Sequence, residues 1–303
     1  MSEKNSMFDY FVVPFNAMGS RCEIKLYAHE PKHAQRVAAQ AIQTVKRLER
    51  RYSRYLDDNR LSAINRAAKA GASIEVDEET AGLLNYAEAC YLNSDGLFDI
   101  SSGILRVAWD FGSAGLPEQS RIEALLPRIG WDKLSWRAPL LSFSRPGMEL
   151  DFGGIVKEYA ADQCAVICQQ AGIGHGLINL GGDIRIIGPH PDGSPWSVGI
   201  RHPRDKNRHY SHIRLESGAV SSSGDYERCI RIGDRYYSHI LDPRSGWPVS
   251  GLASVTVIAE HCLVAGSLST IAMLKATAGE SWLRENAVRA LWVDINGNCG
   301  ESP

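Results

Sequence analysis

A glycine-rich segment in the middle of the chain carries a carboxylate and a lysine around two glycines. In LDFGGIVKEYAAD, residues 150–162, Asp151 precedes the glycines and Lys157 falls on the first turn of an expected helix. Backbone N–H groups at the start of a helix bind phosphate well, and a nearby lysine adds a mobile positive charge. The GxxxxGK[ST] spacing of a Walker loop is absent. The segment indicates either a phosphate site or an ordinary connection from strand to helix.

Two further segments combine glycine with polar side chains. NLGGDIRIIG, residues 179–188, has the pattern of strand, glycine turn and strand that is typical of a hairpin. In SSSGDYERC three serines precede Gly224, and His239 follows later, three residues before Asp242. A Ser-His-Asp hydrolase is not supported, because no GxSxG motif is present. The nine histidines form no HExxH motif, and His239 is also compatible with an ordinary strand histidine.

The composition is that of a globular protein without a signature for nucleic acid or membrane. The 303 residues are 44% hydrophobic and 22% charged, and the formal net charge is -2, so a basic nucleic-acid footprint is excluded. The N-terminus lacks the pattern of a signal peptide, and no stretch reaches the ~18 apolar residues of a membrane span. The seven cysteines are scattered without CxxC pairs. We therefore expect reduced cysteines and a cytoplasmic location.

Hydrophobic periodicity predicts the elements that must position these residues. Helical spacing predicts helices over residues 31–52, 77–92, 117–127, 154–172 and 264–274. Alternating or apolar runs predict strands over residues 21–28, 148–154, 176–188, 196–203, 212–222, 229–243 and 253–259. Because most of the later strands follow one another without helices, we expect an α+β fold with antiparallel sheets and packed helices. We expect a single domain over residues 1–303, with two intertwined lobes as the alternative, and disorder over residues 1–10.

Eight segments with polar or glycine-rich character follow one another along the chain. They are AMGS, SRYLDDNRLSAIN, GLFDIS, LDFGGIVKEYAAD, INLGGDIRIIG, WSVGIRHP, SSSGDYERC and SHILDPRSGWPV. Together they resemble the ApbE family, the FAD:protein FMN transferases, over nearly the whole chain. Two of the motifs are specific, namely DxGGxxKxYAxD at residues 151–162 and HxxDPxxGxP at residues 239–248.

The resemblance implies a substrate, a metal and a partner. Members of the family bind FAD in an elongated cleft, cleave its pyrophosphate and move the FMN half onto a threonine or serine hydroxyl of a target flavoprotein. AMP is the other product, and a divalent metal, usually Mg²⁺, lies beside the pyrophosphate. The resemblance thus implies FAD as substrate, Mg²⁺ as cofactor and an acceptor flavoprotein as partner, with no part for nucleic acid or a membrane span.

The resemblance also implies roles for individual residues. FAD contacts are implied at Met18, Tyr55, Phe98, Asp99, Ile100, Asp151, Lys157, Ser222, Ser223, His239 and Ile240. Metal contacts are implied at the Gly154 carbonyl and at Thr270. Lys157, backbone N–H groups and the metal would neutralise the pyrophosphate. Either His239 or a carboxylate such as Asp151 would accept the proton of the acceptor hydroxyl.

One position departs from the family pattern. The segment AGSLST, residues 265–270, corresponds to a family segment that reads approximately ADALST, whose Asp and Thr share one helical face and hold the metal. Thr270 is kept, whereas Gly266 stands at the Asp position. Because a hard cation prefers charged oxygen ligands, this loss predicts weaker Mg²⁺ binding unless Asp151 or Asp183 compensates.

Three functions are therefore compatible with the sequence. The chain is an active FMN transferase that tolerates Gly266, an FAD-binding protein with weak or no transfer, or a pyrophosphatase that splits FAD into FMN and AMP. If the missing ligand is the defect, replacing Gly266 by Asp is expected to raise the Mg²⁺-dependent activity.

Overall fold

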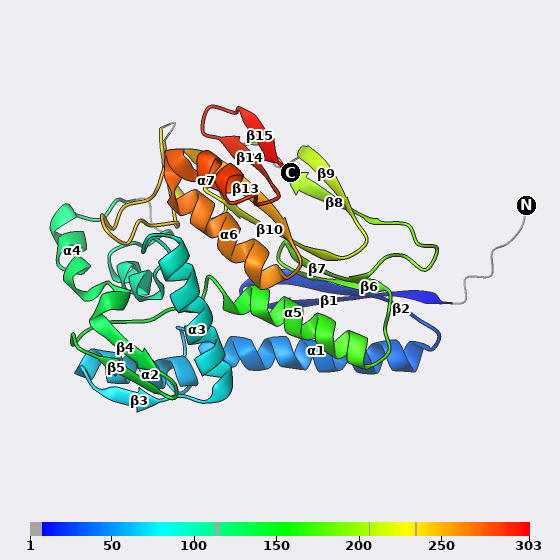
Figure 1. Ribbon diagram of the computed structural model, residues 1–303, viewed down its shortest axis with the longest axis horizontal. Coiled ribbons are helices and arrows are strands. Elements are labelled where there is room, and N and C mark those ends of the chain that lie inside the picture. Colours follow the sequence, from blue (N-terminus) through cyan, green and yellow to red (C-terminus); the bar gives the residue numbers. More distant parts are fainter. Residues whose placement is uncertain (1–7, 113–114, 206, 234) are drawn as a thin grey trace, which may run out of the picture. The chain divides into compact units, whose positions relative to one another are not determined.

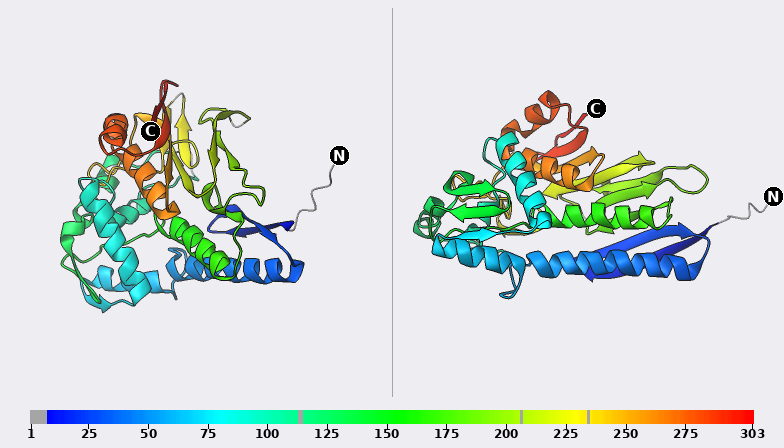
Figure 2. Two further views of the ribbon diagram at one scale, coloured as in Figure 1. Left: turned by 45° about the vertical axis from the view of Figure 1, so that its right-hand side comes forward. Right: turned by 60° about the horizontal axis from the view of Figure 1, so that its bottom comes forward.

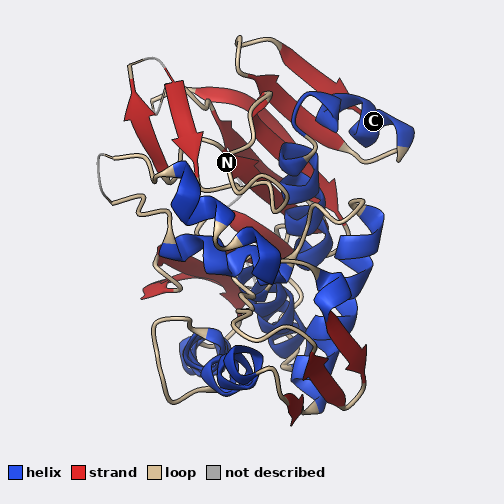
Figure 3. Ribbon diagram, turned by 90° about the vertical axis from the view of Figure 1, so that its left-hand side faces the viewer, coloured by secondary structure: helices blue, strands red, loops and turns tan. Residues whose placement is uncertain are grey.

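The computed structural model describes residues 8–112, 115–205, 207–233 and 235–303 (Figure 1). Its helices and antiparallel strand pairs confirm the expected α+β fold (Figure 3). The α-helices are α1 (Pro31–Tyr52), α2 (Arg60–Ala70), α3 (Glu78–Asn93), α4 (Gln119–Glu123), α5 (Val156–Gln170), α6 (Cys262–Leu274) and α7 (Gly279–Glu285). Short 3-10 helices cover Ile100–Val107, Leu126–Arg128, Trp131–Lys133 and Ala276–Ala278. Over the described ranges, no helix has both the length and the apolar character that crossing a membrane requires.

The strands form one large sheet and three small ones. The large sheet has the order β1 (Asp9–Ala17), β2 (Ser20–Ala28), β6 (Gly176–Leu180), β7 (Asp183–Gly188), β10 (Gly218–Gly224), β13 (Leu252–Ala259), β14 (Ala290–Asp294), β15 (Cys299–Ser302). The small sheets are formed by β3 (Ser73–Glu75) with β5 (Leu140–Phe143) and β4 (Leu134–Arg137), by β8 (Trp196–Arg201) with β9 (His209–Leu215), and by β11 (Cys229–Ile232) with β12 (Arg235–Ser238). The disorder expected over residues 1–10 does not extend to Asp9 and Tyr10, which begin β1, and residues 1–7 lie outside the described ranges.

The chain divides into two compact units, and each unit is made of three segments. Unit 1 comprises residues 1–49, of which those from residue 8 are described, together with 156–222 and 256–266. Unit 2 comprises residues 50–155, 223–255 and 267–303. Four of the five divisions fall inside α1, β10, β13 and α6, so each of these elements has residues in both units, and the fifth falls directly before α5.

Unit 1 buries the apolar stripe that the sequence predicted on α1. Val37, Ala41, Val45 and Leu48 are each 0% exposed. The Cys164 thiol of α5 donates to the Ala41 carbonyl at 3.4 Å, so α1 and α5 lie side by side (Figures 1 and 2). All seven cysteines of the chain are free.

Unit 2 corrects the strand that was expected over residues 148–154, because these residues form no strand. The side-chain amide of Asn65 on α2 binds the backbone of Leu150 at both ends: Leu150 N donates to Oδ1 at 2.8 Å, and Nδ2 donates to the Leu150 carbonyl at 3.0 Å. The next backbone N–H, that of Asp151, donates to the Ile100 carbonyl at 2.8 Å. The backbone hydrogen bonds of this segment are therefore made with the Asn65 side chain and with the 3-10 helix that begins at Ile100, not with a neighbouring strand. A hydrophobic pattern alone does not reveal such partners.

A glycine breaks the strand that was expected over residues 212–222. β9 ends at Leu215 and pairs with β8, whereas β10 begins at Gly218 and pairs with β7. Gly218 has a φ of +89°, and a Cβ at this position would lie 2.8 Å from the Ala259 carbonyl oxygen. Only glycine fits this turn without strain, and the chain changes sheet there.

Loss of the α2 N-cap is expected to destabilise unit 2. The Asn59 Oδ1 accepts from Ser62 N at 2.8 Å, and its Nδ2 donates to the carbonyls of Arg50 and Ser53 at 2.8 and 2.6 Å. Replacing Asn59 by Ala removes all three bonds and is expected to cost about 1–2 kcal/mol of unfolding free energy, measured by urea denaturation. The matched variant Asn59→Asp keeps the cap and is expected to lose less than half as much. Equal losses in the two variants would contradict this role of the cap.

Candidate functional site

Asp151 holds the glycine turn that precedes α5. Its Oδ1 accepts from Gly153 N at 2.8 Å, and its Oδ2 accepts from Arg54 Nη1 at 2.6 Å. A Cβ on Gly103 would lie 2.4 Å from the Asp151 Cβ, so only glycine at 103 permits this approach. Both carboxylate oxygens are thus engaged, one in shaping the turn and one in an ion pair. Asp151 was among the site residues predicted from the sequence, but Arg54 was not. The one hint of Arg54 in the sequence is that it precedes the predicted contact Tyr55.

Aromatic residues of unit 2 lie next to this turn. A Cβ on Gly154 would approach the Phe98 ring to 3.4 Å, so Phe98, which is 6% exposed, packs directly on the turn. Tyr55 is 77% exposed and has the Arg54 guanidinium 5.3 Å from its ring centroid. The Phe98 ring thus supports the turn, whereas the exposed Tyr55 ring is a surface on which a planar heterocycle can stack.

Asp99 and Ile100 have structural contacts that sequence reasoning did not anticipate. The Asp99 Oδ1 accepts from Ser101 N and Oγ at 2.8 and 2.7 Å, and its Oδ2 accepts from Trp131 N at 3.1 Å. Asp99 thereby caps the 3-10 helix Ile100–Val107, and burial raises the pKa of its carboxyl group. The Ile100 side chain is 6% exposed. The contacts described for Asp99 are those of a residue that positions Phe98 and the turn.

Hydroxyl groups of β10 and α6 meet within unit 2. The Ser223 Oγ lies 2.8 Å from the Ser269 Oγ and 3.0 Å from the Thr270 Oγ1, so the predicted FAD contact Ser223 and the predicted metal contact Thr270 are neighbours. Ser222 belongs to unit 1 and its Oγ lies 2.8 Å from the Thr256 Oγ1. Because successive side chains of a strand point to opposite faces, Ser222 and Ser223 do not share a face of β10.

His239 and Ile240 follow β12 in unit 2. The His239 side chain is exposed, and its Nδ1 lies 3.2 Å from the Arg228 carbonyl, which favours the tautomer that carries the proton on Nδ1. The Phe111 ring meets the His239 ring edge-on, with 6.5 Å between the centroids. Ile240 is buried, and its carbonyl accepts from Val249 N at 3.0 Å. This bond joins the two strands of the HxxDPxxGxP turn and fixes the base of the His239 side chain.

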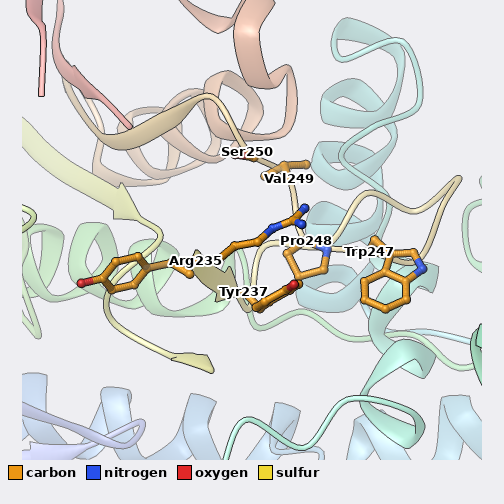
Figure 4. Close-up of a pocket in the computed structure, with 7 residues that line it drawn as sticks. Arg235, Tyr237, Trp247, Pro248, Val249 and Ser250 are labelled. Carbon is orange, nitrogen blue, oxygen red and sulfur yellow. The ribbon is translucent and has the colours of Figure 1, made fainter. Parts of the chain in front are cut away.

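A shallow pocket lies beside this turn, but it contains none of the predicted site residues. Figure 4 shows the Arg235 side chain extending toward Pro248, with its guanidinium 5.0 Å from the Tyr237 ring centroid. The pocket is lined by Arg235, Tyr236, Tyr237, Trp247, Pro248, Val249 and Ser250. The Arg235 guanidinium forms a cation–π pair with the Tyr237 ring. The pocket contains none of the residues that the sequence had indicated for pyrophosphate chemistry.

Met18 occupies the tight turn between β1 and β2 in unit 1. Its φ is +52°, an uncommon conformation for a residue other than glycine, and its backbone N–H donates to the Glu49 Oε1 of α1. Met18 and Gly19 form the two-residue turn between the paired residues Ala17 and Ser20, and such a hairpin turn requires a positive φ. The ligand role that the resemblance implies for Met18 stays a prediction.

Lys157 and Gly266 meet a carboxylate pair within unit 1. The Lys157 Nζ forms an ion pair with the Asp183 Oδ2, and the Asp183 side chain is 4% exposed. Glu158, the next residue along α5, is 8% exposed. A Cβ on Gly266 would lie 2.5 Å from the Glu158 Cγ and 3.1 Å from its Cδ, so Glu158 fills the space that a side chain at 266 needs. Sequence reasoning missed Glu158 altogether.

The electrostatics of Glu158 are those of a carboxyl group held near a second carboxylate. Burial first, and then the Asp183 carboxylate, raise the pKa of Glu158 to about 8, while Lys157 opposes this rise. The Glu158 Oε2 is buried and has no hydrogen-bond partner within the described part of the chain. Carboxylate oxygens are the ligands that hard cations prefer, and Glu158 and Asp183 are the acidic groups that suit such an ion here. No group of three or more His, Cys, Asp or Glu that could hold a metal occurs among the described residues.

The stability of the metal-free protein is expected to fall as the pH rises. The pKa of Glu158 is about 8 in the folded protein against an ordinary value of 4.5, so its contribution is fully present below about pH 4.5 and is lost as the pH rises through 8. In EDTA the melting temperature is therefore expected to fall between about pH 4.5 and pH 8 and to level off above that range. The variant Glu158→Gln is expected to flatten this fall, because an amide stays neutral. A fall of the same size in the variant would show that other groups cause it.

Comparison with known proteins gives consistent matches over most of the chain. The model of the ApbE family matches residues 18–292. The chain is 31% identical to the FAD:protein FMN transferase of Klebsiella pneumoniae (strain 342), over 86% of this chain and 79% of that protein. It is 33% identical to the FAD:protein FMN transferase of Rhodobacter capsulatus, over 74% of this chain but only 43% of that protein's length. Among solved structures, the ApbE protein from Thermotoga maritima superposes with a TM-score of 0.87 at 30% identity, covering 97% of both chains.

Proposed function

Because this chain belongs to the ApbE family, we propose that it is an FAD:protein FMN transferase, which cleaves FAD and attaches FMN to a threonine or serine of an acceptor flavoprotein. The observation that carries the proposal is the folded form of the DxGGxxKxYAxD segment. Asp151 closes the glycine turn through Gly153, Phe98 packs on that turn, and α5 begins immediately after it. A helix N-terminus preceded by a glycine turn suits a pyrophosphate group.

The reaction is a phosphoryl transfer in which the acceptor supplies the nucleophile. The acceptor hydroxyl oxygen forms a bond to the phosphorus of the FMN half, the P–O bond to the AMP half breaks, and AMP leaves with the electron pair. Such a reaction needs positioning and neutralisation of charge more than covalent chemistry by the enzyme. Lys157 and the backbone N–H groups at the start of α5 supply positive charge. The resemblance names the Gly154 carbonyl and Thr270 as the groups that would hold Mg²⁺, which would supply Lewis-acid polarisation of the pyrophosphate.

His239 is the better of the two candidates for the base that accepts the hydroxyl proton. Both oxygens of Asp151 are engaged, by Gly153 N and by Arg54, which leaves that carboxylate a positioning role. The His239 imidazole is exposed, and the contact of its Nδ1 with the Arg228 carbonyl favours a basic Nε2. The seven free cysteines support a cytoplasmic location for this activity.

Intact-mass spectrometry of an acceptor domain tests the proposal. The full chain is incubated with FAD, Mg²⁺ and an acceptor flavoprotein domain, and the acceptor mass and AMP release are followed together. A mass gain of one FMN with matching AMP is expected, and an acceptor whose threonine is replaced by valine is expected to show neither. AMP and free FMN without a mass gain would instead indicate a pyrophosphatase. FAD that is bound but remains intact would indicate a binding protein.

A further inference from the structure

Position 266 lacks the carboxylate that the resemblance leads one to expect, and the structure places another carboxylate in the same space. A Cβ built on Gly266 would lie 2.5 Å from the Glu158 Cγ, 3.1 Å from its Cδ and 3.2 Å from its Oε1. Cβ atoms do not come this close to other atoms in real structures, so a side chain at 266 would require the Glu158 side chain to move. The Glu158 side chain of α5 occupies this space. Its carboxyl group therefore lies close to where a side chain at position 266 would begin.

The carboxyl group of Glu158 is placed for a ligand that the chain does not itself provide. The residue is 8% exposed, and its Oε2 is buried with no hydrogen-bond partner over the described ranges. Burial and the neighbouring Asp183, which also shares a side-chain hydrogen bond with Glu158, raise the pKa of Glu158 to about 8, so a proton holds the place that a bound cation would take. The neighbouring Asp183 already has an ion pair with Lys157, which leaves that lysine shared between two acidic groups.

We propose that Glu158 is a direct ligand of the divalent cation and replaces the carboxylate that Gly266 lacks. The carboxylate has moved from α6 to α5, and the glycine at 266 is what makes room for it. Thr270 lies one helical turn beyond Gly266 on α6, so the polar positions of that helix keep their spacing. That a cation is needed follows from the proposed transferase function, on which this inference rests. Where it would bind follows from the closeness of Glu158 to Gly266.

A simpler account is that Glu158 is a buried, neutral packing residue beside Asp183. The two accounts differ in the response to a neutral isostere. Glu158→Gln keeps the volume and the polar end of the side chain but removes the charge that a hard cation binds. A packing role predicts that cation affinity is unchanged in this variant. A ligand role predicts that affinity falls while the folded state is retained.

Direct titration of the full chain with Mn²⁺, followed by electron paramagnetic resonance with and without FAD, tests the inference. Mn²⁺ is the probe because carboxylate sites for Mg²⁺ also accept it. Glu158→Gln is expected to weaken binding by at least about tenfold, since even groups that only support a ligand change affinity by that much. The matched control Glu23→Gln removes a part-buried carboxylate of β2 in unit 1 and is expected to leave affinity unchanged.

The double variant Glu158→Gly, Gly266→Asp moves the carboxylate back to α6. It is expected to bind Mn²⁺ within about threefold of the unaltered chain, as a carboxylate returns to the same space. Glu158→Gln that melts cooperatively and binds Mn²⁺ as tightly as the unaltered chain would overturn the inference. Because the titration needs no acceptor, Mn²⁺ binding that depends on Glu158 but is accompanied by no FMN transfer would overturn the proposed function alone. FMN transfer together with unchanged binding in Glu158→Gln would overturn this inference alone.

Discussion

Replacing Gly266 by Asp in the otherwise unaltered chain is expected to lower both its stability and its Mg²⁺-dependent transfer. The new Cβ would lie 2.5 Å from the Glu158 Cγ, so the core must shift to accept it. Overpacking of this kind costs about 1–3 kcal/mol, and a further carboxyl group beside Glu158 and Asp183 adds unfavourable charge. We expect a total loss of about 2–4 kcal/mol in unfolding free energy by urea denaturation. The sequence alone predicted a gain in activity, and the contact with Glu158 reverses the expected sign.

The same substitution made after Glu158 has been shortened provides the control. With glycine at 158 the space beside residue 266 is open, so the aspartate is expected to cost less than about 1 kcal/mol. Transfer is measured in parallel by the rate of AMP release at several Mg²⁺ concentrations. A single Gly266→Asp variant that is as stable as the unaltered chain and more active would contradict the proposed competition for space. It would also restore the view that 266 is an unfilled ligand position.

Replacing Asp151 by Ala is expected to reduce kcat/KM for FMN transfer by about 100-fold. The substitution removes the acceptor of Gly153 N and the partner of Arg54 in one step. Loss of a charge-assisted bond together with a turn contact corresponds to about 3 kcal/mol, and each 1.4 kcal/mol is about a tenfold change in rate. The Arg54 guanidinium, with its side chain 27% exposed, would then be left beside the turn without its carboxylate.

Asparagine at 151 separates a positioning role from a role as base. Asp151→Asn keeps an oxygen that can accept from Gly153 N but cannot take up a proton at neutral pH. We therefore expect a loss of only about tenfold for the asparagine variant, measured by acceptor flavinylation under conditions matched to the alanine variant. Losses of equal size in the two variants would indicate that the proton, not the turn, depends on Asp151, and His239 would lose its place as the proposed base.

Hydrophobic periodicity predicted the elements whose stabilisation is local in sequence. The stripe Val37, Ala41, Val45 and Leu48 is fully buried in α1, because spacing of three and four residues is itself the signal of a one-sided helix. The hairpin of β6 and β7 was also expected, since its strands flank a glycine pair. These features follow from neighbours in the chain, so a single sequence is sufficient to predict them.

Features that depend on distant residues were beyond the sequence. Residues 148–154 read as a strand, yet Asn65 of α2 takes the hydrogen bonds of Leu150 and no strand forms. The oxygens of Asp99 cap a 3-10 helix and accept from Trp131 N, contacts that the sequence did not indicate, while its predicted contact with FAD stays a prediction. Side chains such as these choose partners only once the fold has assembled, and no local pattern records that choice.

The residues of the site stay predictions. The glycine-rich segment pointed to Asp151 and Lys157 as groups that suit a pyrophosphate, and the resemblance to the ApbE family added Thr270. Neither could name Glu158, since its relation to Gly266 joins α5 to α6 and is visible only in three dimensions. The absence of a carboxylate at position 266 could be read from the sequence. That the Glu158 side chain fills the space there could not.

The division of the chain inside α1, β10, β13 and α6 limits which fragments of the protein can fold. Each unit is assembled from three separate stretches, and four of the five passages from one unit to the other lie inside a helix or strand. No single break in the polypeptide yields either unit whole, and a break inside α1, β10, β13 or α6 severs secondary structure and leaves backbone groups unsatisfied. A fragment that ends inside one of these four elements is therefore expected to fold as neither unit.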